Sequence, residues 1–92
     1  MADAKFRLRV FTPAGLILDE ETESVKLPAA DGEIGVLPQH TKYSGLLGEG
    51  TLEFTSGAGV RRITVSGGLT QFAHNTLTVL ADKVEGVIGE QV

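Results

Sequence analysis

Residues 51–66 read TLEFTSGAGVRRITVS, and this stretch predicts a β-hairpin. Leu52 and Phe54 alternate with polar residues in its first part, and Ile63 and Val65 do so in its second part. Alternation with a period of two is typical of a strand that buries one face. The residues between the two parts, SGAG, suit a short hairpin connection because they include glycine. The stretch therefore predicts two antiparallel strands that place these apolar side chains in one core.

Similar apolar runs extend in both directions from the hairpin, and turn-forming residues separate them. The predicted strands are residues 5–10, 15–18, 23–27, 34–37, 43–47, 51–55, 60–66, 69–73 and 76–80, with turns at 31–33, 48–50 and 67–68. The other side chains that we expect to point inward are Phe6, Leu8, Val10, Val25, Leu27, Leu77 and Val79. Short strands at such spacing indicate an all-β fold, a sandwich or barrel of about ten strands, mostly antiparallel.

The chain has 92 residues, which fits a single domain. We expect the β-sandwich domain at residues 1–82 and a short tail at 83–92. In the tail Gly86 and Gly89 disfavour a helix, so we expect an extended or frayed segment. The domain alone is expected to be a monomer.

Charge and composition exclude several classes of function. The net charge is −4, and basic residues do not cluster beyond Arg61-Arg62, so nucleic acid is not an expected partner. The chain has no cysteine, which excludes disulfides and cysteine-ligated metals. No apolar run approaches the roughly 18 residues of a membrane span. We therefore expect no direct membrane insertion. The first residues lack a targeting pattern, so we expect a cytoplasmic chain.

No pattern in the sequence indicates covalent chemistry. Ser66 lies outside any G-x-S-x-G motif, and His40 and His74 lack the spacing of metal ligands. The acidic run at residues 19–23 reads as a solvated run that protects a sheet edge. Lys83 stands in a segment faintly like the modified turn of lipoyl carrier domains, although too few residues follow it for the second half of such a domain. We expect no catalytic residue, metal or cofactor.

Several segments together resemble one family. They are residues 8–15, ESVKLP at 23–28, DGEIGVLP at 31–38 followed by His40, VSGG at 65–68 and NTLTVLAD at 75–82. In this order and at these spacings they resemble the epsilon subunit of F-type ATP synthases over residues 5–82. The resemblance implies a flattened β-sandwich, which is the N-terminal domain of that family.

The resemblance also implies a function without a bond-making step. In the family this domain binds the gamma subunit and the loops of the membrane c-ring in the central stalk. It fixes the rotor to the ring, so that ion translocation remains coupled to ATP synthesis. The chain is therefore expected to be a rotor subunit at the cytoplasmic face of an energy-transducing membrane.

Two sets of contact residues follow from the resemblance. Those at the c-ring are Asp31, Gly32, Glu33 and His40, and those facing the gamma subunit are Thr12 and Ser66. Carboxylates in the first set would complement a basic residue on the ring loops. Plainer interpretations stay open: Glu33 as an ordinary turn carboxylate, His40 as a loop histidine, and Thr12 and Ser66 as strand-end hydrogen-bonding residues.

The sequence also departs from the family. The family usually continues Ala-Pro-Leu after His40, whereas this chain has Thr41-Lys42-Tyr43. The family's C-terminal helical hairpin is absent, so its inhibition of ATP hydrolysis and its ATP binding are not expected of this chain.

Two other functional classes stay open: a general β-sandwich binding module, for carbohydrate for example, and the lipoyl-type carrier modified at Lys83. Exposed aromatic residues would favour the first of these, but the chain has no tryptophan and one tyrosine.

Overall fold

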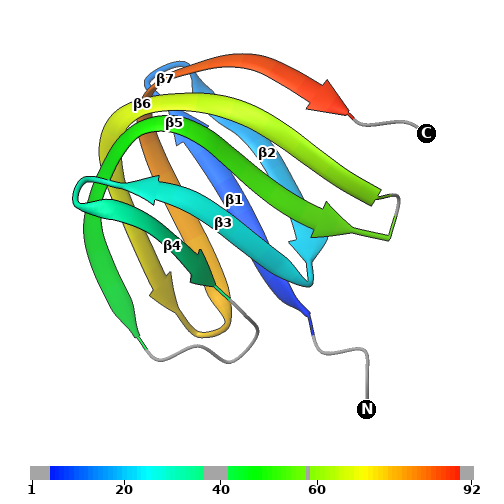
Figure 1. The fold of residues 1–92 in the computed structure, drawn as a ribbon. Helices are drawn as coiled ribbons and strands as arrows, with labels where there is room; N and C mark the ends of the chain where they lie inside the picture. The colour runs from blue at the N-terminus through cyan, green and yellow to red at the C-terminus, as the bar shows by residue number, and fades with distance from the viewer. Residues whose placement is uncertain (1–4, 37–41, 58, 90–92) are drawn as a thin grey trace.

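The computed structural model describes residues 5–36, 42–57 and 59–89, and their side chains up to residue 86 (Figure 1). These ranges contain seven strands and no helix: β1 (Phe6–Thr12), β2 (Gly15–Thr22), β3 (Ser24–Ala29), β4 (Gly32–Val36), β5 (Tyr43–Ser56), β6 (Gly59–Ala73) and β7 (Thr76–Gly89). The prediction of an all-β fold is confirmed.

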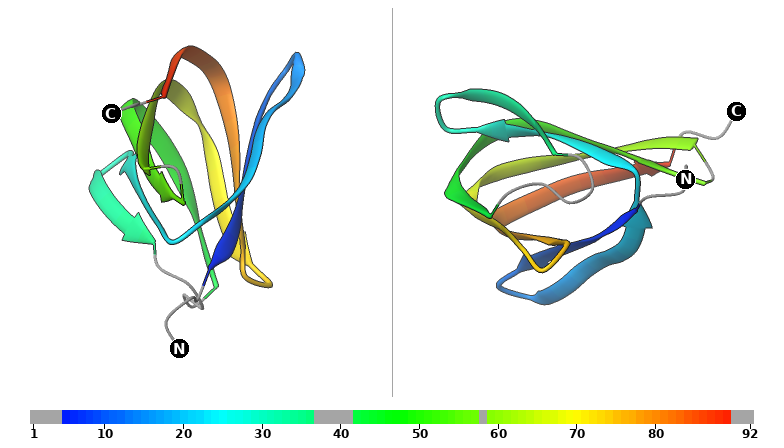
Figure 2. Two further views of the ribbon diagram at one scale, coloured as in Figure 1. Left: turned by 90° about the vertical axis from the view of Figure 1, so that its right-hand side faces the viewer. Right: turned by 90° about the horizontal axis from the view of Figure 1, so that it is seen from below.

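The strands form one hydrogen-bonded sheet that bends over on itself. Their order is β2-β1-β7-β6-β5-β3-β4, and every neighbouring pair is antiparallel except β1 and β7, which are parallel. Strands β5, β6 and β7 are long and curve through the bend, so each contributes to both layers of a flattened sandwich (Figures 1 and 2). Layer one contains β2, β1 and the half of each long strand that lies on the same side of the bend as β1 and β2. Layer two contains β3, β4 and the other halves.

The described residues form seven strands and not about ten, because two predicted turns are bends that join four of the nine predicted strand ranges into β5 and β6. The residues at 48–50 lie inside β5, and those at 67–68 lie inside β6. Pairing continues on both sides of the bend, with Leu47 opposite Gly68 and Glu49 opposite Ser66. Gly67 and Gly68 have φ angles of 70° and 127°, which glycine adopts without a steric penalty. Glycine spacing predicts a change of direction, but it does not separate a turn from a bend.

Residues 19–22 and 83–89, which lie outside the predicted strands, are strand residues in the structure, and for the tail this agrees with the extended alternative. Residues 83–89 form the second half of β7 and pair with β6. Gly86, at φ 60°, lies at a shift in this register that has the character of a β-bulge. The acidic run at 19–23 starts inside β2 and continues just past the end of this strand. Because β2 is an edge strand of the sheet, the run lies where the edge-protecting interpretation requires. Glu20 also forms an ion pair with Arg61 of β6, which joins the layers.

The core lies between the two layers and contains the side chains that alternation predicts. All of the predicted inward residues are buried: Phe6, Leu8, Val10, Val25, Leu27, Leu52, Phe54, Ile63, Val65, Leu77 and Val79. Phe6 and Phe72 pack edge to face, with ring centroids 5.5 Å apart. The alternating residues therefore account for most of the packing that holds the layers together.

Thr22 is a fully buried polar residue at the end of β2. Its hydroxyl donates to the carbonyl oxygen of Thr55 at 2.5 Å and accepts from the backbone N–H of Ser24 at 3.3 Å. We expect Thr22→Val to lower the free energy of unfolding by about 1–2 kcal/mol, because the Ser24 N–H loses its acceptor and the Thr55 carbonyl loses a donor. Urea unfolding would measure this. Thr64→Val, at an exposed position, is the control, and equal effects in the two variants would contradict the prediction.

Candidate functional site

The outer face of layer one carries a continuous row of apolar side chains, which we call the apolar row. It consists of Leu46, Leu69, Leu80, Phe11 and Leu16. Each is the cross-strand partner of the next, from β5 through β6, β7 and β1 to β2. The four leucines are 47–61% exposed, and Phe11 is half-buried. The row therefore crosses layer one at right angles to its strands.

The apolar row is the main exposed apolar feature of the described residues. Only one other large hydrophobic residue in this part of the chain, Ile17, is exposed. A groove of about 320 Å³ runs beside the row, between its leucines and the polar side chains of Ser44, Gln71 and Thr78. Contiguous apolar surface with a polar border is typical of a protein-binding site.

The apolar row was not predicted, although the sequence carries a signal for it. Leu46 directly precedes the buried Leu47, and Leu80 directly follows the buried Val79. Neighbouring residues on a strand point to opposite faces, so one member of each apolar pair must lie outside the core. A search for breaks in the alternation would have identified the outer residues.

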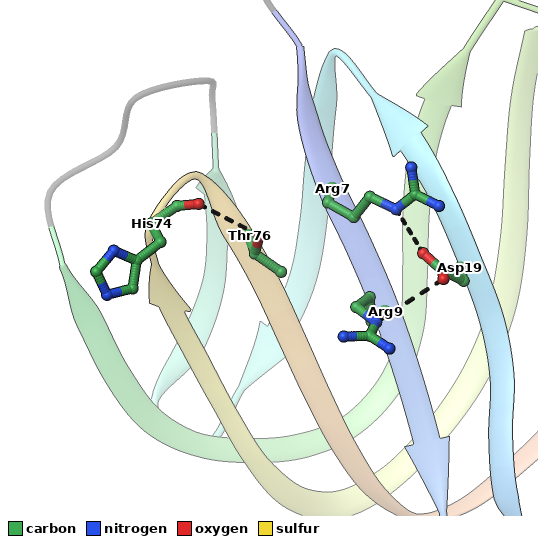
Figure 3. A network of polar contacts seen from close by, with 5 residues as sticks. All are labelled: Arg7, Arg9, Asp19, His74 and Thr76. Atoms are coloured by element: carbon green, nitrogen blue, oxygen red, sulfur yellow. Dashed lines mark hydrogen bonds and ion pairs between the residues drawn. The ribbon is translucent and has the colours of Figure 1, made fainter.

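A second row, which we call the polar row, lies beside the apolar row on the same face. It consists of Ser44, Gln71, Thr78, Arg9 and Asp19. At one end, Nε of Arg7 donates to Oδ1 of Asp19 at 2.6 Å, and Nε of Arg9 is 3.9 Å from Oδ2 (Figure 3). Cζ of Arg9 lies 5.4 Å from the ring centroid of Phe11 in the apolar row. An arginine cluster therefore stands where the two rows meet β1.

The hydrogen bond from Arg7 lowers the pKa of Asp19 below its ordinary value of 3.8. When a carboxyl has a lower pKa in the folded chain than in the unfolded chain, it stabilises the fold at every pH above its unfolded-state pKa. This contribution is lost as the pH falls through the lower, folded-state pKa. We expect Asp19→Asn to lower the melting temperature slightly at pH 7, with the difference shrinking below about pH 4. A carbon-13 titration of the Asp19 carboxyl tests the cause directly, and a pKa at or above 3.8 would contradict it.

Thr12 and Ser66, the predicted gamma-facing residues, both adjoin Lys83. Thr12 and Lys83 line a groove of about 580 Å³ between the β1–β2 turn and β7, and Ser66 is the cross-strand partner of Lys83. The Thr12 hydroxyl accepts a hydrogen bond from the backbone N–H of Ala14 at 3.1 Å, as the plainer interpretation requires. Ser66 lies within β6, so it is not at a strand end. The structure thus brings the two residues close to Lys83.

The predicted c-ring residues occupy the β3–β4 hairpin, which projects from the sandwich (Figures 1 and 2). Asp31 lies in the turn, and its side chain is exposed. Gly32 and Glu33 belong to β4, where Glu33 is opposite Pro28, so two of the three residues of the predicted turn at 31–33 are strand residues. The Glu33 carboxylate is nevertheless exposed, as expected. His40 lies outside the described residues.

The two alternative classes lose their sequence-based support. All five aromatic residues lie in the described ranges, and each is buried or half-buried, so they provide no exposed platform for a sugar. Lys83 lies within β7, opposite Ser66, and it pairs with Glu85 at 3.2 Å. It therefore does not stand on the hairpin tip that a carrier lysine requires. The described ranges contain no group of three or more potential metal-ligating side chains, and no helix that could span a membrane.

Comparison with known sequences gives consistent matches along the chain. The profile of the ATP synthase delta/epsilon chain β-sandwich domain matches residues 5–87. The ATP synthase epsilon chain of Desulfitobacterium hafniense is 41% identical over 87 residues, which are 95% of this chain and 64% of that protein. The epsilon chain of Solibacter usitatus is 42% identical over 78 residues, 85% of this chain and 58% of its own length. The chain thus spans less than two thirds of these relatives.

Two solved structures share the fold. A chain in the Euglena gracilis mitochondrial ATP synthase, in an OSCP/F1/c-ring structure, superposes with a TM-score of 0.82 at 23% identity, covering 88% of this chain and 52% of that one. A chain in the central stalk and c-ring of the Tetrahymena thermophila mitochondrial ATP synthase gives a TM-score of 0.69 at 17% identity, covering 85% and 63%. The likeness supports the β-sandwich architecture described above.

Proposed function

Because this chain belongs to the family of ATP synthase delta/epsilon chain β-sandwich domains, we propose that it is a non-catalytic subunit of the central stalk. In this role it binds the gamma subunit and the c-ring, and so couples ion translocation to ATP synthesis. It acts at the cytoplasmic face of the membrane, held there by its partners. The observation that carries the proposal is the apolar row, which gives a domain of this family a large surface for another protein.

The gamma subunit is assigned to the outer face of layer one. Burying the exposed parts of four leucines there would contribute substantially to binding, at roughly 25 cal/mol for each Å² of apolar surface removed from water. Thr12 and Lys83 line one groove, and Ser66 is the cross-strand partner of Lys83. The two predicted gamma-facing residues are therefore assigned to the border of the gamma contact, near Lys83.

The c-ring is assigned to the β3–β4 hairpin. Asp31 and Glu33 are both exposed on this projecting element, and Asp31 borders a groove of about 430 Å³ with Tyr43 and Ser44. Carboxylates on the rim of an interface favour partners with basic groups and accelerate encounter. His40, in the neighbouring segment of the sequence, remains part of the proposed contact.

Co-elution with the gamma subunit of the same source tests the proposal. The chain alone is expected to be monomeric by sedimentation. Mixed with gamma at micromolar concentrations, it is expected to elute as a one-to-one complex by size-exclusion chromatography with mass detection. A folded chain that forms no complex at tens of micromolar would contradict the proposal and favour a general binding module.

Charge reversal at the hairpin tests the c-ring contact. We expect Glu33→Lys to weaken retention of the central stalk on the c-ring by a few-fold, and increasingly so at low salt, because an exposed ion pair contributes about 1 kcal/mol or less. Glu23→Lys carries the same charge change at another exposed position and is the control. Equal retention of the two variants across a salt series would remove Glu33 from the contact.

A further inference from the structure

Arg9 holds an unusual position on the outer face of layer one. It is the polar-row residue next to Phe11 on β1, and its guanidinium lies over the Phe11 ring. The Nε atom of Arg9 is buried and has no hydrogen-bond acceptor among the described residues. The side chain as a whole is 44% exposed, so the end of the guanidinium remains at the surface.

The charged groups around Arg9 leave it without a hydrogen-bonded counterion. Asp19 is the nearest carboxylate, but its Oδ1 accepts from Arg7 at 2.6 Å, and its Oδ2 is 3.9 Å from Arg9. Glu21, the cross-strand partner of Arg7, acts electrostatically on Arg7. Thr78, the partner of Arg9 on β7, carries no charge. Arg7 therefore has two acidic neighbours, whereas Arg9 shares one of them without a hydrogen bond.

The groove beside the apolar row leads towards this arginine. Its walls include Leu80 and Thr78 of β7, and these are the cross-strand partners of Phe11 and Arg9. A segment that lies along the groove would cover Leu46, Leu69 and Leu80 and would reach Arg9 at the β1 end. There the guanidinium presents N–H donors in a planar fork, which matches the two oxygens of a carboxylate.

We propose that Arg9 selects and orients the gamma subunit by binding a carboxylate side chain on the gamma segment that lies along the apolar row. This inference rests on the proposed function. The segment it requires has aliphatic side chains facing the leucines and one Asp or Glu at the end nearest β1. Because the apolar contacts are non-directional, the charge pair at one end is what fixes the direction in which the segment lies.

Binding of purified gamma subunit to four forms of the chain tests this inference. These are the natural chain, Arg9→Glu, Arg9→Lys and the control Lys26→Glu, each first shown to be folded by circular dichroism. Lys26 is an exposed basic residue of β3 in layer two, so its reversal changes the net charge equally without altering the groups around Arg9. We expect Arg9→Glu to weaken binding by at least about tenfold, Arg9→Lys to recover part of this loss, and Lys26→Glu to change binding by less than about threefold.

A charge swap identifies the partner group. Reversing the matching acidic residue of gamma is expected to restore binding to Arg9→Glu and to weaken binding to the natural chain. Equal losses for Arg9→Glu and Lys26→Glu, or no loss for either, would overturn the role of Arg9 while leaving the proposed function intact. If the natural chain itself did not bind gamma, the proposed function would fail with it.

Discussion

Replacing Gly68 by alanine is expected to abolish the native fold or to lower the free energy of unfolding by about 4 kcal/mol or more. Gly68 lies in the bend of β6 at φ 127°, a conformation that is strained for every residue with a side chain. An added Cβ would also overlap the carbonyl oxygen of Leu80 on the neighbouring strand. Because that oxygen belongs to the backbone, the clash is relieved only by separating β6 from β7.

Thermal unfolding measures this effect. A loss of this size corresponds to a fall in melting temperature of at least about 15 °C for a domain of this length. Gly35→Ala is the matched control, because Gly35 is a strand glycine without a positive φ and has no atom within 4 Å of an added Cβ. The control is expected to change stability by less than about 0.5 kcal/mol. A melting temperature for Gly68→Ala within a few degrees of the natural chain would contradict the described bend.

The second large effect is expected at the centre of the apolar row. We expect Leu69→Asp to weaken binding of the gamma subunit by about 2 kcal/mol or more, which is roughly 30-fold. Leu69 is 50% exposed, and it is paired with Leu46 on one side and Leu80 on the other. A carboxylate placed there would lose much of its hydration on binding, without a partner in the row. The fold is expected to tolerate the change, because the side chain lies outside the core.

A matched variant separates this effect from general charge repulsion. Thr64→Asp adds the same charge to an exposed position of β6 in layer two. Isothermal titration with purified gamma is expected to show nearly natural affinity for Thr64→Asp. If Leu69→Asp bound as tightly as Thr64→Asp, the gamma subunit would have to be assigned to a different surface.

The alternation of apolar residues predicted the strands and the core because burial of one face imposes a period of two. Phe6, Leu8 and Val10 illustrate this, since each is buried and each alternates with a basic residue. The turn predicted at Gly67-Gly68 was wrong, because the backbone there changes direction without leaving its strand. Glycine permits a change of backbone direction, but the pairing with neighbouring strands decides whether a turn or a bend results.

The candidate site was less predictable from the sequence than the fold. The exposure of Glu33 followed from the turn predicted at residues 31–33, although the residue proved to be in a strand. The apolar row was missed because its members come from five different strands, and only the register of those strands places them side by side. Arg9 gave no local signal either, since its importance depends on Phe11 beneath it and on the groove that ends beside it.

The parallel pairing of β1 with β7 bears on how the protein is made. β1 lies between β2 and β7 in the sheet, and its residues pair with Thr76–Leu80, near the other end of the chain. During synthesis β1 emerges long before β7. Until β7 emerges, β1 can form hydrogen bonds only with β2. Contacts between such distant residues slow folding, and an unpaired edge invites association with other chains. The growing chain is therefore most exposed to aggregation until Thr76–Leu80 have emerged from the ribosome and paired with β1.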